Sequence, residues 1–259
     1  MIITADEIKT GKSKQTIKSL VSGGSGTGKT FFGLTFPRVA YLGTEPNGLD
    51  TARSNPMLLD NLVWADDFIP SPTEDIKVTL DREDKAIDKV HQDFKDGKVE
   101  TLFLDNLTYH AQNVWIYINK YEPSRNSKGD LDTRGMYGNL STKLYKFFFM
   151  KICSFPGNVV VSCHEQTEGD EAMEDKVDKS MTISPAILGG FRNMVSGMLS
   201  ASIYLEKKRI GDNKYMYQAR CQKGNNRDAK NRYNLPEIVE NVSYQTILNS
   251  IGTNLTQVK

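Results

Sequence analysis

One stretch near the start of this 259-residue chain constrains its fold more than any other. Residues 22–30 read Ser-Gly-Gly-Ser-Gly-Thr-Gly-Lys-Thr and fit the pattern G-x-x-x-x-G-K-T. An apolar segment, 16–21, precedes the stretch, and a helical pattern that begins at Phe31 follows it. A glycine-rich turn between a strand and a helix points backbone N–H groups at an anion, so this context predicts a phosphate-binding P-loop rather than a chance turn.

The residue types in this loop have separate tasks. Backbone N–H groups bind phosphate oxygens, Lys29 supplies a point charge to the β and γ phosphates, and the hydroxyl of Thr30 is a ligand for Mg²⁺. ATP and Mg²⁺ are therefore the expected cofactors; adenine is favoured because the chain lacks a GTPase base-recognition motif. The predicted nucleotide-binding residues are Gly23, Gly24, Ser25, Gly26, Thr27, Gly28, Lys29, Thr30 and Phe31.

The composition fits one α/β domain. The chain is 38% hydrophobic and 25% charged, with a net charge of +1, so it can bury one sizeable core and has no overall basic excess. The cysteines, Cys153, Cys163 and Cys221, are far apart and favour reduced thiols over a disulfide framework or a zinc site. Without a signal peptide or a long apolar span, we expect a soluble cytoplasmic protein that does not bind membranes.

A second strand candidate, 39–42, leads into a turn that carries Glu45. Ligands bind at the carboxyl ends of strands in open α/β sheets. A carboxylate at that edge can orient and deprotonate the water that attacks a γ-phosphate. Position alone leaves this role and a solvated acid in a turn equally open.

Two further strand candidates end in polar residues at the same expected edge. Segment 101–105 ends in Asp105, which we interpret as the carboxylate that holds Mg²⁺ directly or through water, the alternative being a helix N-cap. Segment 158–163 is followed by His164, which either senses the γ-phosphate or is an ordinary edge histidine.

Two long polar segments follow these strands. Residues 122–138 contain glycine and combine Arg125, Lys128 and Arg134 with Tyr137; a loop this long is usually functional or disordered. The acidic residues of 167–179 predict a mobile, solvated loop.

The last part of the chain predicts a hairpin and a basic segment. Residues 200–206 and 215–220 are the hairpin strands, joined by a turn at 211–213. Beyond them, four cations lie among glycine and asparagine, a poor helix and a good phosphate contact, although most charge runs are solvated faces. They are Lys223, Arg227, Lys230 and Arg232.

The order of these parts resembles the RecA-type ATPase core over about residues 16–232. That resemblance implies an α/β fold with a mostly parallel central sheet, helices on both faces and a C-terminal β-hairpin. It divides the chain into an N-terminal extension, an ATPase domain and a helical tail, at 1–15, 16–235 and 236–259. Within this superfamily, the strand end 162–165 and the segment 223–232 look most like small phage-borne proteins linked to single-strand annealing and recombination.

The resemblance also implies site residues and partners. Glu45, Lys29 and His164 would be catalytic, and Thr30 and Asp105 would hold the metal. Segments 122–138 and 165–185 fall where the two DNA-binding loops of the family lie. The DNA-binding residues would be Arg125, Lys128, Arg134 and Tyr137.

The same resemblance suggests a site shared between subunits. Lys223 and Arg227 follow the hairpin, which we place at the far end of the sheet, so we expect them to reach the γ-phosphate of a neighbouring subunit rather than their own P-loop. The expected protein is a Mg²⁺-dependent ATPase of the cytoplasm, or of a phage host's cytoplasm. Its expected partners are single-stranded DNA, further copies in a ring or filament, and a single-strand binding protein. The rival readings are a small-molecule kinase and a nucleotide-switched loader of a partner protein.

Overall fold

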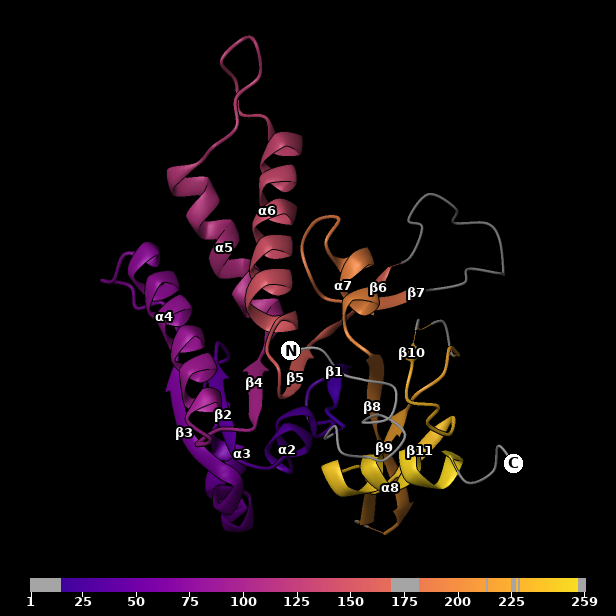
Figure 1. Ribbon diagram of the computed structural model, residues 1–259. Coiled ribbons are helices and arrows are strands. Elements are labelled where there is room, and N and C mark those ends of the chain that lie inside the picture. The colour runs from indigo at the N-terminus through magenta and orange to yellow at the C-terminus, as the bar shows by residue number, and fades with distance from the viewer. Residues whose placement is uncertain (1–14, 169–181, 213, 225–226, 228, 256–259) are drawn as a thin grey trace, which may run out of the picture.

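The structure is a computed structural model that describes residues 15–168, 182–212, 214–224, 227 and 229–255 (Figure 1). One large sheet lies at its centre, with the order β11-β9-β8-β1-β5-β4-β2-β3 and with β10 paired to β8. Its strands are β1 (Lys18–Ser22), β2 (Val39–Gly43), β3 (Leu62–Asp67), β4 (Thr101–Asp105), β5 (Asn158–Cys163), β8 (Ala201–Gly211), β9 (Lys214–Arg220), β10 (Lys230–Asn231) and β11 (Ile238–Glu240).

The strands from β8 to β3 along this order are all parallel, and β9, β10 and β11 add antiparallel pairs at the other edge. Every residue of β2, β4 and β5 is buried, as in a parallel sheet that is covered on both faces. The predicted mostly parallel sheet with a C-terminal hairpin is confirmed.

Helices cover both faces. They are α2 (Lys29–Leu34), α3 (Asp50–Ser54), α4 (Ile76–Lys95), α5 (Leu107–Tyr121), α6 (Thr133–Phe147), α7 (Arg192–Met198) and α8 (Tyr244–Leu255), with a 3₁₀ turn η1 (Pro56–Asn61) and a π-helical segment η2 (Phe148–Cys153). Side chains alternate along β4: Leu102 and Leu104 pack with α4, α5 and α6, whereas Phe103 packs with α2 and α8. The core therefore consists of two clusters of buried apolar side chains, one on each face of the sheet.

The structure corrects the extent of the first long loop. Only 122–132 is loop, because the side chain of Asp132 accepts a hydrogen bond from Gly135 N and caps α6. Arg134 and Tyr137 are therefore on a helix. α5 and α6 extend away from the sheet, with this loop at their tip (Figure 1).

The hairpin lies between the edge strand β11 and β1, so it is next to the strand that leads into the P-loop rather than far from it. The second long segment begins and ends as an antiparallel pair, β6 (Glu165–Glu168) with β7 (Thr182–Pro185), and most of the acidic stretch 167–179 lies outside the described residues, as does the extension up to residue 14.

Candidate nucleotide site

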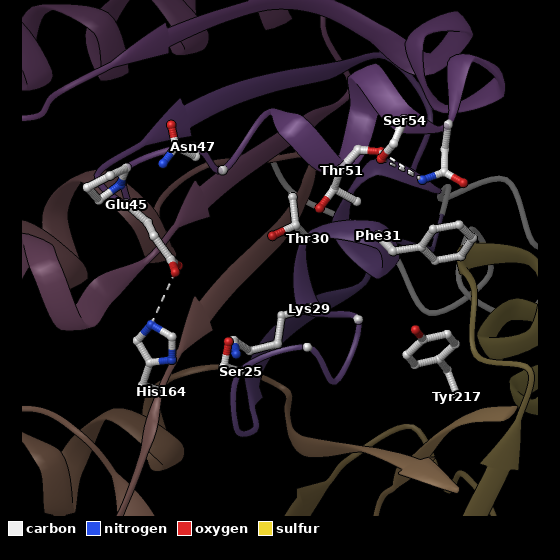
Figure 2. Close-up of a pocket in the computed structure, with 15 residues that line it drawn as sticks. Ser25, Lys29, Thr30, Phe31, Glu45, Asn47, Thr51, Ser54, His164 and Tyr217 are labelled. Carbon is white, nitrogen blue, oxygen red and sulfur yellow. Dashed lines mark hydrogen bonds and ion pairs between the residues drawn. The ribbon is translucent and has the colours of Figure 1, made fainter. Parts of the chain in front are cut away.

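A pocket of about 450 Å³ opens at the carboxyl ends of the parallel strands. Its lining joins the P-loop and the first turn of α2 to Glu45, His164 and Tyr217 (Figure 2). Figure 2 shows Glu45 and His164 at one end of the pocket, Lys29 in the middle, and Phe31 with Tyr217 at the other end. Of the predicted nucleotide residues, Ser25, Gly26, Gly28, Lys29, Thr30 and Phe31 line this pocket.

Glycine is required at two positions in the loop. Gly26 and Gly28 have φ angles of 73° and 90°, which residues with a Cβ atom rarely adopt. A Cβ on Gly28 would also lie 3.0 Å from the ring of Tyr217. The Lys29 ammonium donates to the carbonyls of Gly23 and Gly24, at 2.8 and 2.9 Å. Burial lowers the pKa of Lys29, against the opposing effect of the nearby carboxylates.

Asp105 lies at the base of the site and is fully buried. Its carboxylate accepts hydrogen bonds from Thr30 Oγ1 at 2.7 Å, from the Tyr41 hydroxyl at 3.2 Å and from Ser162 Oγ. Burial raises the pKa of Asp105, and the bonds from Ser162 and Thr30 oppose that rise. No sequence motif indicates that Tyr41 and Ser162 support this carboxylate.

The pair of Thr30 and Asp105 fits Mg²⁺. A hydroxyl and a carboxylate oxygen in contact, directly beside a phosphate-binding loop, are the hard oxygen donors that this ion takes together with phosphate oxygens and water. Among the described residues there is no cluster of three or more His, Cys, Asp or Glu side chains placed to hold a metal.

Glu45 is held by a residue that sequence reasoning missed. Asn106 Oδ1 accepts from Tyr109 N at 3.0 Å and caps α5, which orients its amide nitrogen towards the pocket. Asn106 Nδ2 donates to Glu45 Oε2 at 2.5 Å and lies 3.2 Å from His164 Nε2. His164 Nε2 is 3.5 Å from Glu45 Oε1.

These contacts keep Glu45 ionised. Its pKa is lowered chiefly by the hydrogen bond with His164, against burial, which would raise it. Thr44 adds rigidity, because its hydroxyl donates to Asn106 O at 2.6 Å and accepts from Asn106 N at 2.9 Å. The only signal for Asn106 in the sequence is its place at the start of a helix, after Asp105.

A second cavity of about 630 Å³ lies on the outer side of the P-loop, lined in part by Gly24 and Thr27. Arg227 also lines it and forms two hydrogen bonds of 3.0 Å with Glu165, which accepts from Ser22 Oγ at 3.3 Å. Arg227 thus lies beside its own P-loop, and the premise that it lies too far away is wrong. Lys223 lies between β9 and β10.

The predicted DNA residues are away from this site. Arg125 and Lys128 are exposed in loop 122–132, and Arg125 Nη1 donates to Gly129 O at 2.7 Å. Arg134 is exposed in the first turn of α6, and Tyr137 stacks on Trp115 with ring centroids 4.6 Å apart. The structure groups these residues near the tip of the α5–α6 pair.

No helix in the described parts of the chain combines the length and apolar character needed to cross a membrane.

Comparison with known protein families gives a match over most of the chain. A family model described as an AAA domain, AAA_24, matches residues 15–233. No curated protein matches the chain.

Three of the solved structures that resemble this chain have low sequence identity to it. A KaiC-like protein of the archaeon Pyrococcus horikoshii OT3 is 12% identical, with a TM-score of 0.39, over 83% of this chain and 88% of that one. A type III secretion system ATPase of pathogenic bacteria is 13% identical (TM-score 0.44), over 73% of this chain and 51% of that one. The ATPase EscN of enteropathogenic E. coli is 15% identical (TM-score 0.42), over 73% of this chain and 43% of that one. The chain thus spans about half the length of these two ATPases.

Proposed function

Since this chain belongs to the AAA domain family AAA_24, we propose that it is a Mg²⁺-dependent ATPase that acts on single-stranded DNA, in recombination or annealing of the phage type. One observation carries the ATPase part of the proposal. One pocket is lined by a phosphate-binding loop, by Thr30 and by Glu45 with its neighbour His164, and the buried carboxylate of Asp105 lies directly behind Thr30 and accepts its hydrogen bond.

The chemistry follows from these positions. The loop amides and Lys29 bind the phosphates. Thr30 and Asp105 would hold Mg²⁺, which would supply neutralising charge to the phosphate oxygens. Glu45 accepts a proton from the water whose oxygen attacks the γ-phosphorus, while the bond from that phosphorus to the β–γ bridging oxygen breaks and ADP leaves with the electron pair. Asn106 holds one carboxylate oxygen of Glu45 and fixes the direction of the other.

Two structural connections support an action on DNA. His164 is followed at once by Glu165, the first residue of β6, so a γ-phosphate contact at His164 can shift this strand. α5 begins beside Asn106 and ends at the loop that carries Arg125 and Lys128.

ATP turnover with and without single-stranded DNA tests this function. We expect stimulation by DNA, loss of nucleotide binding in Lys29→Ala, and retained binding without turnover in Glu45→Gln. Equal turnover of Glu45→Gln and wild type would remove Glu45 from the mechanism. Phosphate transfer to a metabolite would indicate a kinase. ATP turnover that neither responds to DNA nor transfers phosphate to a metabolite would indicate a nucleotide-switched loader.

The first loop has its own test. Neutralising three cations together, in Arg125→Gln/Lys128→Gln/Arg134→Gln, should weaken single-strand binding. Each phosphate contact contributes about 0.7 to the slope of log affinity against log salt, so the slope should fall by about 2. An unchanged slope would show that this loop is not the DNA site.

We also propose that the protein assembles into a ring or filament in which Lys223 or Arg227 stabilises the γ-phosphate of a neighbour. In Arg227 this role requires the ion pair with Glu165 to open. Mixing Lys29→Ala with Lys223→Ala/Arg227→Ala should restore part of the activity, because one interface then has both intact halves. A mixture that oligomerises yet stays inactive would rule out a site completed in trans.

A further inference from the structure

The outer half of the β8–β9 hairpin extends beyond the rest of the sheet. β1 pairs with β8 only as far as Tyr204, and β11 pairs with β9 only from Gln218 onwards. The two hairpin strands continue to pair with each other up to Gly211 and Lys214. Within the described residues, this outer half has no strand beside it.

One face of this outer half combines cations and aromatic rings. Lys207 lies opposite Tyr217, and Arg209 lies opposite Tyr215. Because strand side chains alternate, these four residues share one face, which we call the hairpin face. The Lys207 ammonium is 4.3 Å from the ring centroid of Tyr215 and 5.9 Å from that of Tyr217.

The carboxylates of the hairpin do not neutralise this face. Glu206 belongs to the opposite face, where it accepts hydrogen bonds from Gln218 and Arg220. Asp212, at the tip, accepts from Arg209 at 3.3 Å, but this pair is exposed and therefore weak.

A single nucleic-acid strand fits a surface on which exposed cations lie beside an exposed aromatic ring, here that of Tyr215. Cations bind its phosphates, and its bases stack on aromatic side chains. Tyr215 is 49% exposed and can take a base. An alternative role for these cations is to protect an unpaired strand edge from aggregation. That role explains the positive charge, but it does not explain why the Lys207 ammonium lies over two tyrosine rings.

The hairpin face also reaches the nucleotide pocket. Tyr217 packs against Gly28 of the P-loop and lines the pocket at the end where Phe31 lies (Figure 2). A nucleic-acid strand bound on this face would therefore be in contact with a residue that lines the nucleotide pocket.

We propose that the hairpin face is a second binding surface for single-stranded nucleic acid, in which Lys207 and Arg209 bind phosphates and Tyr215 stacks on a base. It is separate from loop 122–132, and it rests on the proposed action on single-stranded DNA.

The test is the fluorescence anisotropy of a labelled oligothymidylate titrated with full-length protein at several salt concentrations. Lys207→Gln/Arg209→Gln should lower the salt slope by about 1.4, the equivalent of two contacts. Tyr215→Ala should weaken binding at least about fivefold with the slope unchanged, and Tyr215→Trp should keep the affinity.

The control removes the same charge elsewhere. Lys85→Gln/Lys95→Gln changes two exposed lysines on α4 and should leave the slope as in wild type. ATP affinity checks folding, because Tyr215 does not line the nucleotide pocket.

The outcomes separate the two proposals. If the hairpin variants bind like wild type while the loop variant is weakened, the hairpin face is not a binding surface and the proposed function stands. If wild type does not bind the oligonucleotide, both are overturned. Weakened hairpin variants beside an unchanged control establish the surface.

Discussion

Replacing Asn106 with serine tests how the proposed general base is held. The amide nitrogen donates to Glu45 Oε2 at 2.5 Å and lies 3.2 Å from His164 Nε2, while the amide oxygen caps α5. Serine keeps an oxygen that can cap the helix but removes the nitrogen from both neighbours. The substitution therefore separates orientation of Glu45 from stability of the helix.

The expected magnitude follows from the bond that is lost. A hydrogen bond to a charged group contributes about 1.5–3 kcal/mol, which corresponds to a fall in kcat of about 10- to 150-fold if the transition state needs the held carboxylate. The KM for ATP should change little, since Lys29 and the loop amides remain.

The pH dependence should change as well. The pKa of Glu45 is lowered, first by His164 and further by the hydrogen bond from Asn106. Losing Asn106 raises that pKa towards its ordinary value. A general base acts as the carboxylate, so activity falls as the pH drops through this pKa, and the acid limb of kcat should move to higher pH in the variant.

Steady-state ATPase assays over a pH series measure both effects. Asn106→Ala is the companion variant, because it also loses the cap, at a cost of roughly 1 kcal/mol that thermal unfolding would show. If Asn106→Ser keeps the wild-type kcat and acid limb, Asn106 does not orient Glu45.

Two further predictions concern packing and the metal. Gly33→Ala should destabilise the fold by about 1–3 kcal/mol, because a Cβ there would lie 2.3 Å from the ring of Phe103. Gly138→Ala should stabilise α6 by about 0.5–1 kcal/mol, because a Cβ there would meet nothing within 4 Å. Chemical denaturation measures the free energy of unfolding of both variants. Asp105→Asn should still bind ATP without Mg²⁺ but lose most of the gain in affinity that Mg²⁺ gives, and calorimetric titration with and without the ion would refute the metal role of Asp105 if the gain persisted.

Much of the core could be predicted because its signals are local. Strand candidates 39–42 and 101–105 are short apolar runs bounded by turns, and β2 and β4 lie there. The glycines of the P-loop motif predict positive φ angles in the loop, and Gly26 and Gly28 have them. Such features depend on neighbouring residues alone.

What could not be predicted depends on pairing between distant segments. The partnership of Asn106 with Glu45 joins residues 61 positions apart, and that of Arg227 with Glu165 spans 62. The place of Arg227 was misjudged because the position of β8 next to β1 is a matter of sheet order, which hairpin signals do not contain. The loop end at Asp132 was missed because glycines that follow it, at 135 and 138, are unusual inside a helix.

Because α5 projects from the sheet, a small rotation at its first turn produces a larger displacement at its far end. Its first turn is fixed beside Asn106, and its 15 residues amount to about 22 Å of stiff rod at 1.5 Å per residue. A tilt of about 5° at the base displaces the far end by about 2 Å, so a movement too small to disturb the buried sheet becomes, at loop 122–132, a displacement comparable to the gain or loss of a direct contact.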